Sequence, residues 1–166
     1  MYLLDANAFM EAARLYYGFD FAPGFWDWLE DPILGGRVGS VAAVRTEILA
    51  GKGELVDWAN KLPAEFWLED SADSLDNLAR LATWANDKDR PYGQAAVSDF
   101  MASADIRIIA LAMAVGGVVV TREVPAPQSK TRVKIPDVCR AFEVPYETPF
   151  EVYRQLGMKL VAPSVS

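Results

Sequence analysis

The fold of this chain is decided by the stretch "ADIRIIALAMAVGGVVVTRE", Ala104 to Glu123. Its first part is apolar on almost every side and predicts a buried helix that ends at the glycine pair Gly116 and Gly117. The next residues, "VVVT", predict a strand without polar alternation, as in strands covered on both faces of a parallel sheet. We therefore expect Thr121 at the carboxyl edge of the sheet, where ligands bind in such folds.

The first residues, "MYLLDAN", predict a second short strand that ends at Asp5. A further strand is expected in "GGRVGSV" (35–41), and "EFWLE" (65–69) is consistent with a strand or a turn. Strands that alternate with helices indicate a parallel sheet with right-handed crossovers. The sequence therefore predicts an α/β fold, a single-domain three-layer α/β/α arrangement with a short, mostly parallel sheet. We expect this domain to span residues 1–160 and a flexible tail to follow at 161–166.

The composition indicates one well-packed domain. The chain has 166 residues, of which 52% are hydrophobic, so it has enough apolar surface for a sizeable core. Its longest apolar run, Ile108 to Val120, is shorter than the roughly 20 residues that a membrane helix needs. No basic segment precedes the first apolar residues, which argues against a signal peptide. The single cysteine, Cys139, favours a reducing cytoplasmic setting.

Two features exclude several classes of function. The chain contains no histidine, which excludes Ser-His-Asp and Cys-His catalysis, histidine-pair ribonucleases and histidine-containing zinc sites. Its formal net charge of −7 argues against ordinary nucleic-acid binding, since such proteins are usually basic.

Four carboxylates lie at or near the ends of separate predicted elements. Oxygen ligands of this kind suit a hard divalent cation, which also offsets the repulsion among crowded acids. Structural alternatives remain for three of them: Asp105 as a helix cap, Glu47 as a solvated helix residue and Glu123 as a loop charge. Asp5 is the hardest to explain without a ligand, because an unpaired charge at a buried strand end is costly. The four candidate metal ligands are Asp5, Glu47, Asp105 and Glu123.

The strings "YLLDAN", "VRTEIL" and "ADIRIIALAMAVGGVVVTRE" together resemble the PIN-domain family of nucleases, which includes toxin subunits of prokaryotic toxin–antitoxin modules. The resemblance runs from Tyr2 to about Glu123, and the tail resembles a PIN-like branch of uncharacterised domains. The family pattern has an acid after the first strand, a small polar residue two positions on, a helical Glu, an Asp that opens an apolar helix, and a strand-end Thr followed by an acid. These positions correspond to Asp5, Asn7, Glu47, Asp105, Thr121 and Glu123.

The resemblance implies a ribonuclease that uses Mg²⁺ or Mn²⁺ and needs neither histidine nor a ribose 2′-hydroxyl. It implies that Asp5 and Asp105 are the best candidates for direct metal ligands, followed by Glu47. Glu123 ranks last, because the family more often has Asp at this position. Thr121 is expected to orient ligands or water. Asn7, which is also placed to cap the first helix, replaces a frequent Ser or Thr and is expected to act similarly.

Two further stretches suggest partners. In "SKTRVKIP" the bases Lys130, Arg132 and Lys134 alternate, so in an extended chain they point the same way and form an RNA phosphate-binding strip. Charge protection of an exposed edge is the structural alternative. The aromatic stretch "YYGFDFAPGFWDW" (16–28) is expected to be mainly core, and any exposed remainder suits a homodimer, an antitoxin or base stacking.

Two other functions remain open at this point. One is a PIN-like binding module that does not cleave RNA. The other is a different α/β phosphotransfer domain, in which Asp5 itself would carry the phosphoryl group. Such sites usually also contain a lysine near the strand-end threonine, and no lysine follows "VVVT" before Lys130.

Overall fold

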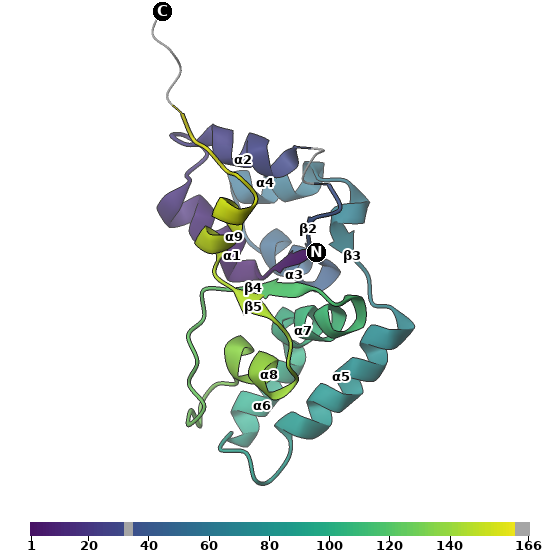
Figure 1. The fold of residues 1–166 in the computed structure, drawn as a ribbon. Coiled ribbons are helices and arrows are strands. Elements are labelled where there is room, and N and C mark those ends of the chain that lie inside the picture. Colours follow the sequence, from purple (N-terminus) through teal and green to yellow (C-terminus); the bar gives the residue numbers. More distant parts are fainter. Residues whose placement is uncertain (32–34, 162–166) are drawn as a thin grey trace, which may run out of the picture.

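A short parallel sheet forms the centre of the molecule. The computed structural model describes residues 1–31 and 35–161. Within them five strands, all paired in parallel, follow the order β3-β2-β1-β4-β5 (Figure 1). Their bounds are β1 Tyr2–Leu4, β2 Val38–Val41, β3 Trp67–Leu68, β4 Val118–Val120 and β5 Tyr146–Glu147. The central strand β1 and its neighbour β4 are the two that the sequence identified most clearly.

Helices cover both faces of the sheet. One layer contains α1, α2, α4 and α9, and the other contains α5, α6, α7 and α8, while α3 contacts α1, α4 and α7 (Figure 1). The bounds are α1 Ala6–Glu11, α2 Pro23–Glu30, α3 Ala42–Leu49, α4 Glu54–Lys61, α5 Ala72–Ala85, α6 Gln94–Ala102, α7 Ala104–Val115, α8 Ile135–Ala141 and α9 Pro149–Gln155. A π-helical turn, Ala12–Tyr16, extends α1, and a 3₁₀ turn, Ala64–Phe66, precedes β3.

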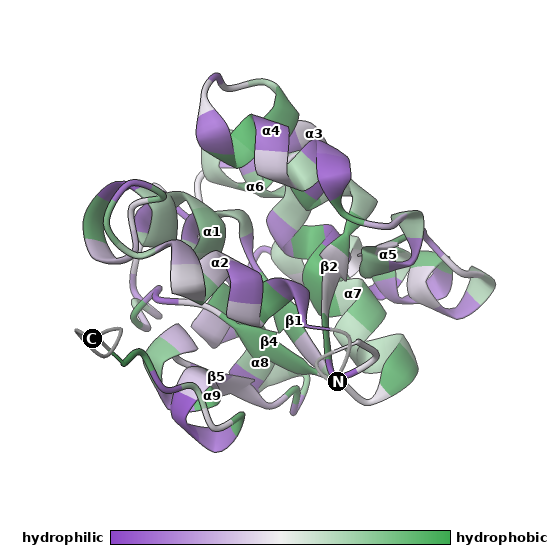
Figure 2. Cartoon of the chain, turned by 90° about the horizontal axis from the view of Figure 1, so that it is seen from above, coloured by the Kyte–Doolittle hydropathy of each residue, from purple (hydrophilic) through white to green (hydrophobic). Residues whose placement is uncertain are grey.

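The core is built around α7, β1 and β4. Leu3 and Leu4 pair with Val119 and Val120, and all four are fully buried. Hydrophobic residues dominate β4 and α7 (Figure 2). Burying such side chains contributes roughly 1.5–3 kcal/mol each. This packing holds the carboxyl ends of β1 and β4 rigidly side by side.

The glycine pair between α7 and β4 has two distinct roles. Gly116 ends α7 in the left-handed conformation, with φ 64°, which glycine adopts without a Cβ clash. At Gly117 an added Cβ would lie 3.2 Å from Leu3 Cδ1 and 3.3 Å from the Met1 carbonyl oxygen. The pair therefore allows α7 to turn directly into a strand that packs closely against β1.

The three-layer α/β/α prediction is confirmed, and the described sheet is entirely parallel rather than mostly so. β3 resolves the ambiguity over residues 65–69, whereas β5 was not predicted, since "PYET" carries no strand pattern. Much of the aromatic stretch is core, with Phe25 and Trp26 buried, but Phe21 is exposed. The predicted tail lies outside the described residues from 162 onward. Across residues 1–31 and 35–161, every helix is too short or too polar to cross a membrane.

Candidate functional site

Asp5 lies at the carboxyl edge of the sheet, directly after β1. Its backbone N–H donates to the Val120 carbonyl at 3.1 Å, and its Oδ1 accepts the Ala8 N–H at 2.6 Å. Asp5 is therefore the N-cap of α1. The prediction that Asn7 caps this helix is wrong, because the helix already begins at Ala6 and Asn7 is an exposed residue of its first turn.

The Asp5 carboxylate is buried and incompletely paired. The residue is 1% exposed, and among the described residues Oδ2 has no hydrogen-bond partner. Burial raises the pKa of Asp5 to about 7; the Thr121 hydroxyl and the Ala8 N–H lower it, and the charges of Asp105 and Glu123 raise it. A buried oxygen without a partner is costly, and a bound cation is one group that would pair with it.

Asp105 lies in the first turn of α7 but does not cap it. Ser103 is the N-cap, and its Oγ accepts the Asp105 N–H at 3.2 Å, so the helix-cap alternative for Asp105 is wrong. Burial, together with the charges of Glu123 and Glu47, raises the pKa of Asp105 to about 6, although Arg132 and Lys134 act to lower it. Asp105 thus lies within electrostatic range of two other acids and two bases.

Glu47 projects from α3 toward the start of α7. Its Oε1 accepts the Ala104 N–H at 3.0 Å, and this bond joins α3 to α7 through two residues that are 57 positions apart in the sequence. The residue as a whole is exposed, as expected if Glu47 were simply a solvated helix residue. Its carboxylate is nevertheless fixed beside Asp105, one residue from the N–H that it accepts.

Glu123 is the centre of a small ion-pair network. Its side chain is 7% exposed, and Oε1 lies 3.0 Å from Lys134 Nζ and 3.2 Å from Arg132 Nη2. Its Oε2 accepts the Ile135 N–H at 2.8 Å, and its own N–H donates to Thr121 Oγ1 at 3.0 Å. The reading of Glu123 as a plain loop charge is wrong, because both of its carboxylate oxygens have partners.

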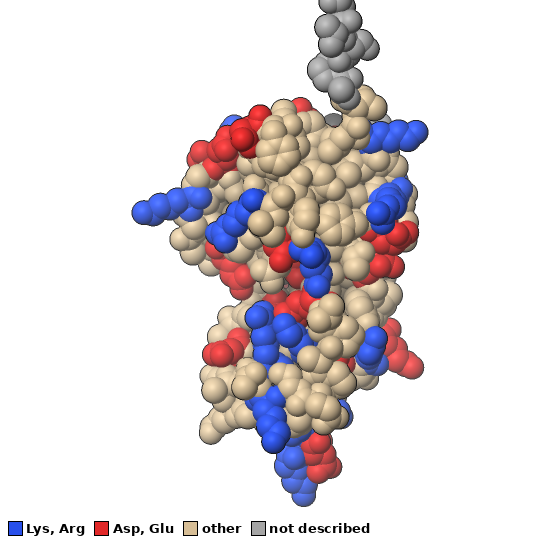
Figure 3. Space-filling model, turned by 90° about the vertical axis from the view of Figure 1, so that its left-hand side faces the viewer, with Lys and Arg blue, Asp and Glu red and all other residues tan. Residues whose placement is uncertain are grey.

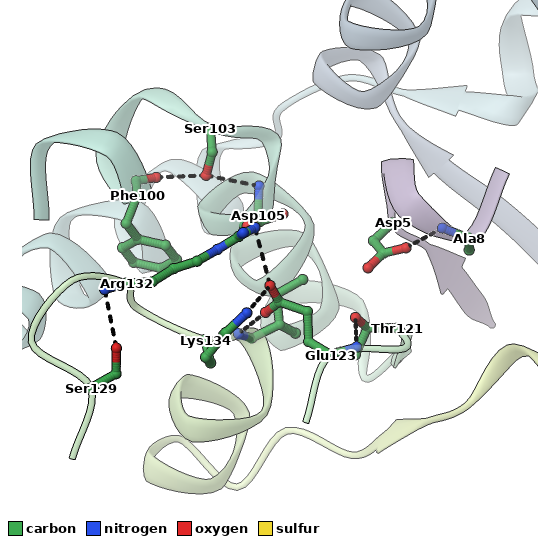
Figure 4. A network of polar contacts seen from close by, with 11 residues as sticks. Asp5, Ala8, Phe100, Ser103, Asp105, Thr121, Glu123, Ser129, Arg132 and Lys134 are labelled. Carbon is green, nitrogen blue, oxygen red and sulfur yellow. Dashed lines mark hydrogen bonds and ion pairs between the residues drawn. The ribbon is translucent and has the colours of Figure 1, made fainter. Parts of the chain in front are cut away.

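The basic strip is not a straight, extended segment. Arg132 and Lys134 converge on Glu123 as Figure 4 shows, whereas Lys130 is exposed. Lys130 lies in a bend, and its backbone carbonyl accepts the Gly93 N–H at 2.8 Å. The extended backbone on which the expected alignment of the three bases depends is therefore absent at Lys130, where the chain bends before it leads into α8.

Four acids from four elements share one edge of the molecule. The charges of Asp105 and Glu123 raise the pKa of Asp5, and the charges of Glu123 and Glu47 raise the pKa of Asp105. Figure 4 shows Asp5, Asp105 and Glu123 together with the side chains of Arg132 and Lys134. On this face of the surface, acid atoms lie in a hollow bordered by Lys and Arg atoms (Figure 3). Within the described part of the chain, no three acidic or cysteine side chains converge closely enough to hold a metal ion as they stand.

The acids at one end of this edge offer oxygen atoms of the kind that hard divalent cations take as ligands. Asp5 offers a free buried oxygen, and Asp105 and Glu47 lie within electrostatic range of the cluster. Both carboxylate oxygens of Glu123 already have partners, since two cations contact Oε1 and the Ile135 N–H donates to Oε2.

Two hollows flank the acids and were not predicted. One, of about 350 Å³, is lined in part by Glu47, Asp70 and Arg107. The other, of about 210 Å³, is lined in part by Asp105 and Arg132. A nearby ion pair was also missed: Arg122 donates to Glu11 and lies over the Tyr16 ring, 5.0 Å from its centroid. Sequence gave no signal for these, because each depends on how loops between elements fold back.

No curated protein and no solved structure matches the chain. Residues 2–160 match the family described as "Domain of unknown function (DUF4411)". Because this match covers nearly all of the chain, the protein belongs to that family.

Proposed function

We propose that the protein is a metal-dependent ribonuclease that hydrolyses RNA phosphodiester bonds, and that it acts as the toxin of a toxin–antitoxin pair. The observation that carries the proposal is the buried Asp5 Oδ2, which has no partner among the described residues and lies at an edge shared with Asp105 and Glu123. The resemblance to PIN-domain nucleases supports the same reading, because its pattern covers these residues.

Asp5, Asp105 and Glu47 would hold Mg²⁺ or Mn²⁺. Once bound, the ion would lower the pKa of a water molecule and offset charge on the phosphate. The chain's own part is to fix these carboxylates: Ala8 orients Asp5, and Ala104 orients Glu47. The absence of histidine is no obstacle to such chemistry.

Thr121 and Asn7 would orient groups around the acids. Thr121 is buried beside Asp5, its Oγ1 accepts the Glu123 N–H, and its hydroxyl lowers the pKa of Asp5. Asn7 is exposed in the first turn of α1, two residues from Asp5, where it can contact water or RNA. Arg132 and Lys134 would contact RNA phosphates near the acids. Lys130 would contact a phosphate farther along the RNA and contribute less.

The proposal includes partners and a cellular setting. An acidic protein with a net charge of −7 suits an antitoxin that presents a basic segment. Exposed aromatic side chains such as Phe21 and Tyr16 suit an antitoxin or a homodimer contact. We place the reaction in the cytoplasm, where RNA is available and the single buried thiol of Cys139 stays reduced.

The direct test is cleavage of a labelled single-stranded or structured RNA with Mg²⁺ or Mn²⁺. Wild type should cleave it and leave 5′-phosphate and 3′-hydroxyl ends, EDTA should stop the reaction, and Asp5→Asn should abolish it while circular dichroism shows an intact fold. Cleavage that persists in EDTA, or products with cyclic phosphate ends, would rule out this mechanism.

The second candidate is a binding module that does not cleave RNA. It is favoured by the engagement of Glu123 with two bases and by the lack of a tight group of three acids among the described residues. RNA binding without cleavage in either metal would support it. Phosphotransfer to Asp5 is less favoured, because a side chain on a residue only 1% exposed is poorly placed for attack on a phosphoryl donor.

A further inference from the structure

The Glu123 network has no evident value for stability alone. Glu123 is almost fully buried, and it holds two cations rather than one. The Arg132 side chain is 57% exposed and that of Lys134 22% exposed, and ion pairs whose cations stay in contact with water contribute no more than about 1 kcal/mol each. A role at the neighbouring acid cluster explains better why the chain brings Arg132 and Lys134 to this position.

The shared edge is divided into an acidic half and a cationic half. Asp5, Glu47 and Asp105 form the acidic half, which carries formal charges of one sign only. Glu123, Arg132 and Lys134 form the other half, where two bases exceed one acid. The halves are adjacent, because Arg132 lines the same hollow as Asp105. A phosphate bound across both would meet a metal on one side and fixed cations on the other.

We propose that Glu123 is a positioning residue rather than a metal ligand, and that it holds Arg132 and Lys134 as the phosphate-binding half of a site that takes a single metal ion. This inference rests on the proposed function for the identity of the anion. The geometry behind it is the pair of contacts to one oxygen, with Lys134 Nζ at 3.0 Å and Arg132 Nη2 at 3.2 Å, while Ile135 fixes the other oxygen.

The division of labour follows from the charge that develops during hydrolysis. Water adds to phosphorus, the bond to the 3′-oxygen breaks, and the departing oxygen takes up a proton, so one phosphodiester and one water give a 5′-phosphate and a 3′-hydroxyl. Negative charge grows on the phosphate oxygens during this exchange. In two-metal nucleases a second ion offsets that charge. Here Arg132 and Lys134, already oriented by Glu123, would offset it without rearranging.

The first measurement is Mn²⁺ binding by calorimetry, without RNA. Wild type should bind one ion per chain, and Glu123→Gln should keep that stoichiometry with an affinity within about fivefold, because only the local charge changes. Asp105→Asn should weaken binding by more than about tenfold, the scale expected for a lost metal-site group. A loss in Glu123→Gln as large as that in Asp105→Asn, or two ions per wild-type chain, would overturn the proposal.

The second measurement is binding of a fluorescent single-stranded RNA in EDTA across a salt series. Arg132→Gln and Lys134→Gln should each weaken binding and reduce the log–log salt slope by up to about 0.7, the value for one phosphate contact on a single strand. Arg154→Gln is the matched control, because Arg154 is also paired to a glutamate, Glu151, but on the exposed surface of α9. Unchanged affinity and slope in both site variants would refute the phosphate-binding role.

The third measurement separates positioning from mere structural support. In Glu123→Gln the two bases remain and only their anchor is lost, so KM should stay level or fall, while kcat should fall by at least about tenfold through misplacement. A structural role would lower the amount of folded protein and leave kcat per folded molecule unchanged. An unchanged kcat would therefore refute the proposal that Glu123 positions Arg132 and Lys134. If wild type cleaves no RNA, the nuclease proposal fails, and the metal and RNA-binding measurements still decide the roles of Glu123, Arg132 and Lys134.

Discussion

Replacing Asp5 by Asn should make the metal-free protein more stable above neutral pH. In the folded protein burial raises the pKa of Asp5 from 3.8 to about 7. A folded-state pKa above the unfolded one means that folding favours the protonated acid, so Asp5 destabilises the fold once it ionises. Its penalty grows as pH rises from about 4 and is complete above about 7. The Asn side chain carries no charge and can still accept the Ala8 N–H.

The magnitude follows from the size of the shift. A pKa of about 7 against 3.8 corresponds to a full penalty on the order of 4 kcal/mol. Between pH 4.5 and pH 8 the difference in unfolding free energy between Asp5→Asn and wild type should therefore change by on the order of 3 kcal/mol. The buried amide N–H of Asn adds a constant cost of about 1–3 kcal/mol if it finds no acceptor. That cost does not depend on pH, so the change with pH is the quantity to compare.

The assay is urea unfolding in EDTA at pH 4.5, 6 and 8 for wild type, Asp5→Asn and Asn7→Ala. Asn7 lies on the same helix, is exposed and does not ionise, so its difference from wild type should be the same at each pH. At pH 8 with Mn²⁺ at a hundred times its dissociation constant, wild type should gain about 2.7 kcal/mol and Asp5→Asn much less. If Asp5→Asn shows no relative gain between pH 4.5 and pH 8 in EDTA, Asp5 is not a buried acid that opposes folding.

Three further changes test neighbouring features. Asp105→Asn should show the same pH trend with a smaller amplitude, since the pKa of Asp105 is raised to about 6, and a trend as large as that of Asp5→Asn would contradict the difference in burial. Ser103→Ala should lower the free energy of unfolding by about 1 kcal/mol through loss of the α7 cap, measured by urea unfolding, whereas Ser103→Asn, which caps without adding charge to the acids, should preserve it. Gly117→Ala should lower it by about 1–3 kcal/mol, because the added Cβ crowds Leu3 and the Met1 carbonyl, and a neutral result in thermal unfolding would show that β1 can shift.

The central elements could be predicted because their signals are local. The apolar helix, the glycine pair and "VVVT" identify α7 and β4, and "YLLD" identifies β1. Parallel pairing then requires Asp5 and Thr121 to share one edge, as observed, since Leu4 pairs with Val120. β5 escaped prediction because two residues carry no period, and its place beside β4 is fixed by tertiary packing.

The site was less predictable, because its contacts join residues distant in the sequence. Glu47 meets the start of α7 across 57 residues, and no short motif links them. The meeting of Glu123 with Lys134 depends on the loop between β4 and α8 turning back on itself, which the alternating bases do not encode. Sequence therefore indicated which residues carry charge at the edge, but not which charges neutralise one another.

Those neutralising contacts bear on how the chain folds with four acids at one edge. Arg132 and Lys134 offset Glu123, and their charges also lower the pKa of Asp105. A raised pKa leaves much of Asp5 protonated near neutral pH, so it too adds less negative charge than its formal count. Both effects reduce the repulsion that tertiary packing around α7, β1 and β4 has to overcome. We therefore expect a folded protein in EDTA, with metal binding to a site whose protein scaffold already exists, and far-ultraviolet circular dichroism that changes little when Mn²⁺ is added.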